Sequence, residues 1–174
     1  MTTRPSRQRG ITLIEAATVL AIAGVLAGVA APSFDAARQR HHLQGAAALF
    51  ETDVHFARAS AVALGQPVRL DFQAEAGRAC YVLHTGPRGA CNCLGEQPVC
   101  ESSTALRSVR YTPAQPFVLT SNSGSMVFDD VAGTVTPTAT VRFTATNGDA
   151  LHQVVNVMGR VRSCSPTLAG VPRC

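Results

Sequence analysis

A long uncharged segment near the amino terminus is the feature that most constrains this chain of 174 residues. Residues 10–15 read Gly-Ile-Thr-Leu-Ile-Glu, and the sequence from Ala16 to Phe34 then has no charged side chain. At about 1.5 Å of rise per residue, a helix over residues 11–34 is long enough to cross a hydrocarbon core of about 30 Å. We therefore expect a transmembrane helix over residues 11–34.

Two charged features lie at the start of this helix. Residues 1–10 carry three arginines, Arg4, Arg7 and Arg9, and no acid. Glu15 is a carboxylate inside the apolar segment, where a charge is costly, although less so near the interface than at the bilayer centre. A positively charged partner would offset that cost.

The motif at residues 10–15, followed by the apolar segment, resembles the prepilin signature of type IV pilins and type II secretion pseudopilins. In that class a prepilin peptidase cuts after the glycine and N-methylates the new first residue. The resemblance implies a leader peptide of residues 1–10, cleavage between Gly10 and Ile11, and methylation of Ile11. It also implies that Glu15 is an assembly residue that neutralises the amino terminus of a neighbouring subunit, because opposite charges attract strongly in a low-dielectric bundle.

Some residues depart from that signature, and an ordinary secretory signal is the alternative. Ile11 stands where the family usually has phenylalanine, and Ala16 where it usually has leucine, whereas Pro32 matches a helix-bending proline of many pilins. A secretory signal would be cut after its apolar region, at small residues such as Ala30 and Ala31. That alternative leaves Glu15 unexplained.

The charge balance points only weakly to nucleic acid. The formal net charge is +4, but three of the arginines lie in the predicted leader. All fifteen basic residues are arginine. The planar guanidinium fork suits phosphate better than a point ammonium does.

Six cysteines follow the predicted membrane segment: Cys80, Cys91, Cys93, Cys100, Cys164 and Cys174. An even number on the translocated side of an anchored protein predicts disulfides in an oxidising periplasm. Loop closure favours Cys164 with Cys174, whereas Cys91 and Cys93 are too close to bond each other easily and should each pair with Cys80 or Cys100. A zinc site among the four is the alternative, but Cys-x-Cys is not the usual ligand spacing.

The remaining sequence predicts a helix and then a sheet. Residues 35–64 continue the helical period with an apolar face formed by Leu43, Ala46, Ala47, Phe50, Val54, Ala57, Ala61 and Leu64. Residues 65–174 contain seven short alternating segments separated by turn residues, at 68–72, 80–84, 107–111, 117–120, 126–128, 138–145 and 151–157. Asn147-Gly148 is a hairpin signal because both residue types tolerate positive φ. The expected fold class is α+β, with a long amino-terminal helix packed on an antiparallel β domain.

Both ends of this domain resemble the FimT/GspH type of minor pilin. The resemblance rests on residues 57–61 leading into Gln-Pro-Val-Arg-Leu at 66–70, and on Gly-Arg-Val-Arg at 159–162. It implies a type IV pilin-like fold over most of the chain.

No catalytic constellation is visible in the sequence, and we expect neither enzyme activity nor a cofactor or metal. Asp129 and Asp130 are adjacent, so on a strand they would face opposite sides, unlike a catalytic carboxylate pair. The histidines, His41, His42, His55, His84 and His152, show no ligand spacing.

The candidate binding residues lie near the carboxyl end. From Ala150 onward the chain has Arg160, Arg162 and Arg173 and no acid. Arg160 and Arg162 would project from one face of a strand, and a Cys164–Cys174 bond would bring Arg173 back toward them. Arg142 is a fourth candidate. Two arginines on a solvated terminal strand are common, and it is the FimT resemblance that favours binding to phosphate.

Together these patterns predict a minor type IV pilin that binds DNA non-specifically for uptake in natural transformation. It would be a single-pass inner-membrane protein with a periplasmic domain, and would then join a cell-surface pilus. Its partners would be other pilins, contacted through the amino-terminal helix, the prepilin peptidase and DNA. The alternatives are a GspH-type minor pseudopilin of a type II secretion system and a purely structural subunit that primes the pilus.

Overall fold

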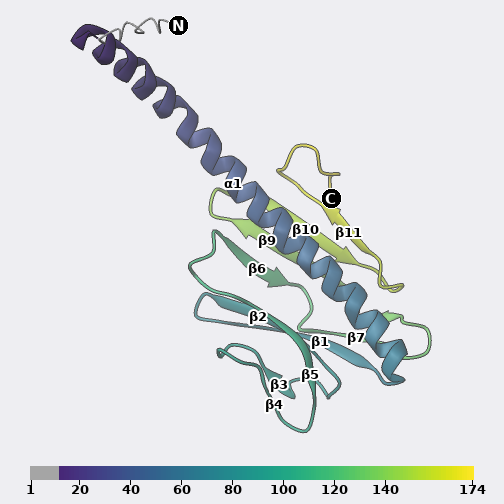
Figure 1. Cartoon of the computed structure of the whole chain (residues 1–174). Helices are drawn as coiled ribbons and strands as arrows, with labels where there is room; N and C mark the ends of the chain where they lie inside the picture. The colour runs from purple at the N-terminus through teal and green to yellow at the C-terminus, as the bar shows by residue number, and fades with distance from the viewer. Residues whose placement is uncertain (1–11) are drawn as a thin grey trace, which may run out of the picture. The chain divides into compact units, whose positions relative to one another are not determined.

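The computed structural model describes residues 12–174 (Figure 1). Helix α1 spans Leu13–Leu64, and the chain divides into two compact units between Arg38 and Gln39. The predicted leader, the predicted cleavage site at Gly10 and the predicted methylation site at Ile11 lie outside the described residues.

Helix α1 begins with a cap made by Thr12. The Thr12 hydroxyl oxygen accepts a hydrogen bond from the Glu15 backbone N–H at 3.3 Å, and the Thr12 carbonyl accepts one from Ala16 at 3.1 Å. Thr-x-x-Glu is the sequence of a capping box, and a carboxylate in the first turn interacts favourably with the helix dipole. Glu15 therefore has a local role at the start of the helix, beside the assembly role predicted for it.

Within residues 12–174, no helix combines the length and apolarity needed to cross a membrane. The single membrane pass predicted over residues 11–34 is not confirmed and stays a prediction. The described apolar side chains of this unit, among them Leu13, Leu20 and Leu26, are exposed.

From Gln39 onward, α1 presents the predicted apolar face to the β strands. The buried positions are Leu43, Ala46, Ala47, Phe50, Val54, Ala57 and Ala61. Leu64, the last residue predicted for this face, is instead 49% exposed, because the helix ends there. Gly65 follows with φ +61°, and the Gln66 N–H donates to the Ala61 carbonyl at 3.3 Å, as in a glycine C-cap.

Eleven strands form three antiparallel sheets in the described residues. The five-stranded sheet has the order β5 (Ala105–Tyr111), β2 (Arg78–His84), β1 (Val68–Glu75), β7 (Ser125–Phe128) and β8 (Val135–Thr136). The four-stranded sheet has the order β11 (Val161–Cys164), β10 (Ala150–Val155), β9 (Ala139–Ala145) and β6 (Phe117–Ser121). A short hairpin joins β3 (Cys91–Asn92) and β4 (Val99–Cys100).

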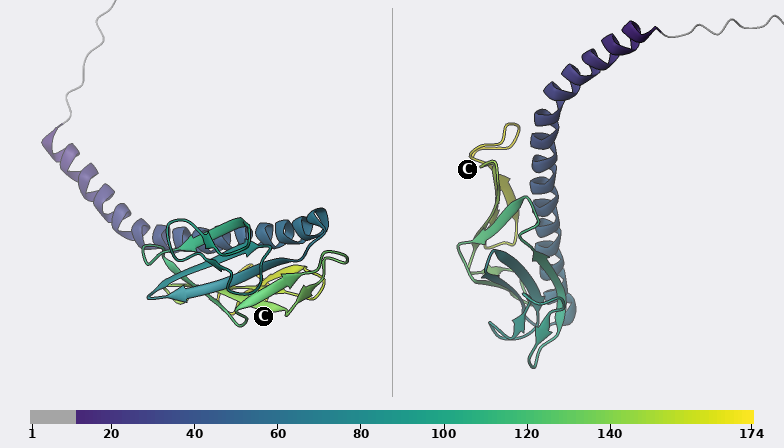
Figure 2. Two further views of the ribbon diagram at one scale, coloured as in Figure 1. Left: turned by 90° about the horizontal axis from the view of Figure 1, so that it is seen from below. Right: turned by 90° about the vertical axis from the view of Figure 1, so that its left-hand side faces the viewer.

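The two large sheets share one hydrophobic core with the second half of α1. Phe50 lies at its centre, with ring centroids 5.6 Å from Tyr81 of β2 and 6.3 Å from Phe143 of β9. Both views in Figure 2 place the strands on one side of this half of the helix. Each sheet therefore has an inner face toward α1 and an outer face away from it. The expected α+β fold, with a helix packed on antiparallel strands, is confirmed.

Asp53 is an acidic residue of α1 outside the predicted apolar face. It is fully buried, and both carboxylate oxygens have partners. Tyr81 donates to Oδ2 at 2.7 Å, and Arg107 of β5 forms an ion pair with Oδ1. Burial raises the pKa of the Tyr81 phenol, so this group stays protonated and donates. Asp53 therefore joins the helix to the five-stranded sheet.

All seven predicted segments contain strands, and β11 corresponds to the terminal strand considered for Arg160 and Arg162. Three strands, β3, β4 and β8, were not predicted, because two-residue strands are too short to show an alternating pattern. In the predicted Asn147-Gly148 turn only Gly148 adopts a positive φ, +89°. The Gly148 N–H donates to Ala145 at 3.0 Å, so the connection is a longer loop and not a two-residue turn.

All six cysteines form disulfides, with the pairs Cys80–Cys93, Cys91–Cys100 and Cys164–Cys174. The first two pairs lie within the alternatives that the sequence left open. Gln73 of β1 holds this region, because its side-chain amide donates to the Cys91 carbonyl at 2.6 Å and its Oε1 accepts from the Cys93 N–H at 3.0 Å.

Candidate functional site

The four predicted binding arginines lie on or next to the four-stranded sheet, and all four are exposed. Arg142 is in β9 and Arg162 is in β11. Arg160 comes one residue before β11, and Arg173 lies in the tail that follows it.

The strand register places Arg142 and Arg162 on the same face. Arg142 is the direct cross-strand partner of His152, and His152 in turn is the partner of Cys164. Arg162 is the partner of Val154 on the same strand as His152, two residues along. Directly opposed residues of antiparallel strands share a face, and side chains two apart on one strand do too.

This shared face is the outer face, away from α1. The neighbouring positions, including Leu151, Val141 and Phe143, are buried in the core. The outer positions of the four strands are Val118, Thr120, Thr140, Arg142, Thr144, Ala150, His152, Val154, Arg162 and Cys164. Among these described positions there is no carboxylate, so the face carries positive charge, hydroxyl groups and an imidazole. We call these ten residues the outer face.

The spacing of the two arginines suits separate contacts with one polyanion. Strands β9 and β11 are separated by β10, so they lie about 9.6 Å apart, and Arg142 and Arg162 are offset by two residues, about 6.8 Å. Their Cα atoms are therefore about 12 Å apart, far enough for each guanidinium to reach a different phosphate.

The outer-face arginines and their neighbours have no internal acidic partner. Among residues 12–174, none of Arg142, Arg160, Arg162 and Arg173 takes part in an ion pair. By contrast, the five-stranded sheet uses arginines internally. Arg69 donates to the Ser125 hydroxyl at 2.9 Å, and Arg110 donates to the Gly95 carbonyl at 2.9 Å.

The turn between β10 and β11 fixes the direction of Arg160. The side-chain oxygen of Asn156 accepts hydrogen bonds from the Met158 and Arg160 N–H groups, both at 3.0 Å. The Asn156 N–H donates to the Arg160 carbonyl at 3.0 Å, which makes the two residues the last pair of the hairpin. From the alternation of side chains in an extended segment, we expect Arg160, two residues before Arg162, to project toward the same side.

Gly159, the first residue of the Gly-Arg-Val-Arg motif, meets a conformational and a steric requirement of this turn. It is buried and has φ +69°, a region that side chains with a Cβ rarely adopt. An added Cβ would lie 3.3 Å from Arg58 Cδ and 3.4 Å from Val135 Cγ2. The motif therefore contains a structural glycine beside exposed arginines.

The carboxyl-terminal tail is anchored to the domain at several points. Leu168 is buried in the core, and the Ser165 hydroxyl donates to the Ala150 carbonyl at 2.6 Å. The Ser165 N–H donates to the Pro172 carbonyl at 2.8 Å, which closes the loop between them. The Cys164–Cys174 bond, with Cα atoms 4.9 Å apart, then holds the last two residues beside the end of β11.

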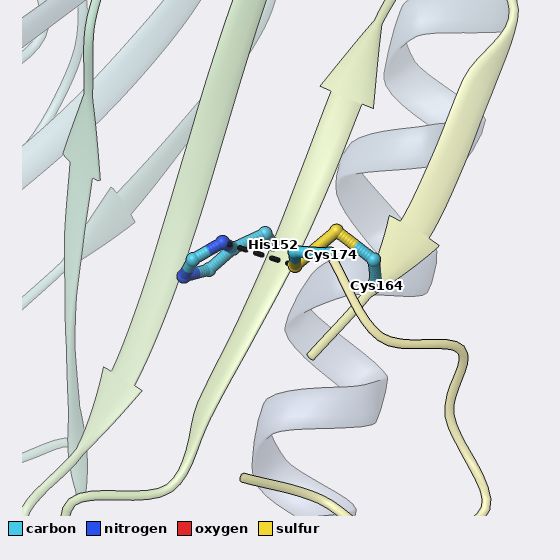
Figure 3. Close-up of side chains that lie close together, drawn as sticks. All are labelled: His152, Cys164 and Cys174. Atoms are coloured by element: carbon cyan, nitrogen blue, oxygen red, sulfur yellow. Dashed lines mark hydrogen bonds between the residues drawn. A yellow bond between two sulfur atoms is a disulfide. The ribbon is translucent and has the colours of Figure 1, made fainter. Parts of the chain in front are cut away.

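His152 contacts this disulfide on the outer face. Figure 3 shows a hydrogen bond between a ring nitrogen of His152, on β10, and the sulfur of Cys174, and the Nδ1–Sγ distance is 3.3 Å. Because a disulfide sulfur carries no hydrogen, Nδ1 must be the donor. Partial burial lowers the pKa of His152, and the charge of Arg142 lowers it further, so the ring is neutral at pH 7.

The ligand atoms of His152, Cys164 and Cys174 all lie within 4.8 Å of one another. Zinc binds cysteine as the thiolate. Because both sulfurs are bonded to each other, this cluster offers a metal only the imidazole.

The adjacent Asp129 and Asp130 belong to a turn, in which Asp129 accepts from the Ala132 N–H at 2.7 Å.

The fold and the amino-terminal motif define a type IV pilin-like subunit. A family model described as a prokaryotic N-terminal methylation motif matches residues 5–31. A second model, described as type II transport protein GspH, matches residues 46–159. The chain belongs to the GspH family, whose members are minor pilins and pseudopilins of type IV pili or type II secretion systems.

A solved structure agrees with this fold. The type IV minor pilin FimU of Pseudomonas aeruginosa has a TM-score of 0.50 at 16% identity, covering 74% of this chain and 95% of that chain. The minor pseudopilin EpsH of Vibrio cholerae has a TM-score of 0.49 at 12% identity, covering 73% and 99%. A sequence search of curated proteins found no match. At such low identity, FimU supports the fold alone.

Sequence reasoning missed two parts of the outer face. It found no role for His152, and it did not include the threonines of β6 and β9. The alternation in β9, Ala-Thr-Val-Arg-Phe-Thr-Ala, does contain the signal, because its polar positions are those that face outward. The pairing of His152 with Arg142 depends on register, which the sequence does not show.

Proposed function

We propose that this chain is a minor pilin of the type IV pilus that binds DNA without sequence preference and serves its uptake. The observation that carries the proposal is the acid-free outer face, with Arg142 and Arg162 on it and Arg160 and Arg173 at its edge. Arginine and threonine side chains are common donors to phosphate oxygens. Contacts of this kind position a nucleic acid and carry no direct sequence information.

The mode of binding follows from the geometry. A sheet face with separate arginines presents no helix or loop to enter a groove and read base edges. Affinity would therefore come from phosphate contacts and fall steeply with salt, because each contact releases counterions. A single subunit would bind weakly, and several subunits or contacts would be needed for firm attachment.

The proposal includes processing and assembly. Cleavage between Gly10 and Ile11 by a prepilin peptidase would release residues 1–10, and the new first residue would be methylated. The chain would be held in the inner membrane by residues 11–34 before it joins other pilins through α1. Intact-mass analysis of the mature protein should show a chain that begins at Ile11 with one added methyl group. A mature chain that begins near Pro32 would contradict the proposal.

The direct test is a gel-shift measurement on residues 38–174, which contain the whole compact unit from Gln39 to Cys174. Duplexes of unrelated sequence should be retarded at similar protein concentrations, and added salt should release them. Absence of any shift at low salt would contradict DNA binding.

A second candidate function is favoured by the family match itself. The model over residues 46–159 is described as type II transport protein GspH, and a secretion pseudopilin contacts protein partners. Under this candidate the outer face would bind an acidic protein surface. A folded domain that fails to bind DNA, together with pull-down of secretion-system subunits, would favour the pseudopilin.

A further inference from the structure

We propose that the Cys164–Cys174 disulfide and His152 are positioning residues that hold Arg173 beside the outer face, where it joins Arg142 and Arg162 in one polyanion-binding surface. This inference rests on the proposed DNA binding. It assigns a role in binding to a bond that would otherwise be regarded as a stability crosslink.

The loop that this disulfide closes is already closed by other contacts. Leu168 is 4% exposed and belongs to the core, and Ser165 bonds both Pro172 and Ala150 through its N–H and hydroxyl groups. The Ser165 oxygen also accepts from the Leu168 N–H at 2.8 Å. Residues 165–172 therefore keep their path without the sulfur bond, and only Arg173 and Cys174 depend on it.

The disulfide directs this short end toward the outer face. Cys164 is a direct cross-strand partner of His152, which in turn is the partner of Arg142, so all three belong to the outer face. Cys164 is 1% exposed, and the Cys174 sulfur bonded to it accepts the Nδ1–H of His152. Because neighbouring Cα atoms are about 3.8 Å apart, Arg173, which directly precedes Cys174, is held next to the outer face.

The charged groups around this point favour an anion. Arg142 faces His152 from β9, Arg162 lies two residues from Cys164 on β11, and Arg173 precedes Cys174 in the tail. The last acidic side chain in the sequence is Asp149, whose carboxylate accepts a hydrogen bond from the Asn147 side-chain amide at 3.0 Å. A polyanion bound here would meet three guanidinium groups from three separate segments, each at a different phosphate.

A double-mutant cycle with the full-length protein, in a non-ionic detergent, tests this role. Arg173→Gln is measured in the parent and in the Cys164→Ser/Cys174→Ser background, with a short labelled duplex as the probe. In the parent, Arg173→Gln should flatten the slope of log K against log salt by about 0.9, so that the ratio of parent to variant affinity falls about eightfold as salt rises by one decade. The Cys164→Ser/Cys174→Ser variant should show nearly the same flattening of the slope by itself. Adding Arg173→Gln to it should change the slope little.

The controls separate three outcomes. Cys91→Ser/Cys100→Ser removes a disulfide of the other region and should leave the slope unchanged, and thermal unfolding should show that each variant is folded. If Arg173→Gln weakens binding equally in both backgrounds, the positioning role is wrong although DNA binding stands. If the parent does not bind the duplex, the proposed function fails and this inference fails with it.

Discussion

Arg142 and His152 are direct partners across strands β9 and β10, on the face turned away from helix α1. The arginine charge and the partial burial of the ring both lower the pKa of His152. The Nδ1–H is occupied by the disulfide sulfur. A proton added to the ring must therefore go to Nε2, where it provides one more donor for an anion.

This relationship predicts that acidic conditions strengthen DNA binding. The lowered pKa leaves His152 neutral at pH 7, and affinity should rise as the pH falls through that pKa and the ring becomes a cation. Titration of binding at fixed ionic strength, between about pH 5 and 7.5, measures the effect. His152→Gln should remove most of the pH dependence, and His55→Gln, on the exposed side of α1, serves as the matched control. A His152→Gln variant with the parent pH profile would contradict this prediction.

Gly159 and Gly45 should respond to alanine with opposite signs. At Gly159 the positive φ alone should cost about 1–2 kcal/mol, and the contacts with Arg58 and Val135 add to it. At Gly45, an exposed helical position with nothing within 4 Å of an added Cβ, alanine should stabilise by up to about 1 kcal/mol. Urea unfolding of both variants checks this. Equal effects would mean that the turn before Arg160 does not need its glycine.

The environment of Asp71 predicts how the stability of the domain changes at acidic pH. The Gly86 N–H donates to His84 Nδ1, so the neutral ring donates from Nε2 to Asp71 at 3.1 Å. Burial acts to raise the pKa of Asp71, but the hydrogen bonds from His84 and the Gly89 N–H outweigh it and lower the pKa. The ionised carboxylate of Asp71 thus stabilises the fold at pH values above the ordinary aspartate pKa. This stability is lost as the pH falls through the lowered pKa.

The measurement is urea unfolding of the parent and Asp71→Asn as a function of pH. At neutral pH the variant should lose about 1.5–3 kcal/mol, the range for hydrogen bonds to a charged group. The difference should shrink below about pH 4, where the unfolded-state carboxylate becomes protonated. A difference that stays constant down to the lowest pH would show that the charge of Asp71 is not the cause.

Glu15 is expected to matter for assembly more than for the folded domain. Glu15→Ala should reduce incorporation into the pilus, because the positive amino terminus of a neighbour loses its partner, while the unit from Gln39 onward keeps its unfolding midpoint. The fraction of protein recovered in sheared pili measures incorporation. Glu15→Gln keeps the size and hydrogen-bonding capacity of the side chain and isolates the charge. Normal incorporation of both variants would remove the assembly role.

The sequence predicted the fold well where one physical pattern dominated. The buried face from Leu43 to Ala61 follows the helical period, and β9 follows the strand period, so both were readable. The burial of Asp53 could not be predicted, because its partners Tyr81 and Arg107 lie far away in the sequence. A buried charge becomes predictable only once its partners are known.

The candidate site was predictable only in part for the same reason. The arginines could be picked out by their spacing and by the absence of acids after Ala150. Their arrangement with His152 depends on strand register, and the anchoring of the tail depends on Ser165 and Leu168, which carry no local signal. The outer face forms only when the four strands pair in the folded domain, so it cannot be predicted from local sequence patterns.

The measurement that tests the central claim most directly is the salt dependence of DNA binding by Arg160→Gln/Arg162→Gln. At about 0.9 units for each phosphate contact, three or four arginines set a parent slope of about −3 to −4 on duplex DNA. The double variant should weaken binding to every sequence about equally and flatten the slope by roughly two units. Arg78→Gln/Arg88→Gln, which removes two exposed arginines outside the four-stranded sheet, should change the slope much less. A folded Arg160→Gln/Arg162→Gln variant that binds DNA like the parent would contradict the account and favour the secretion pseudopilin.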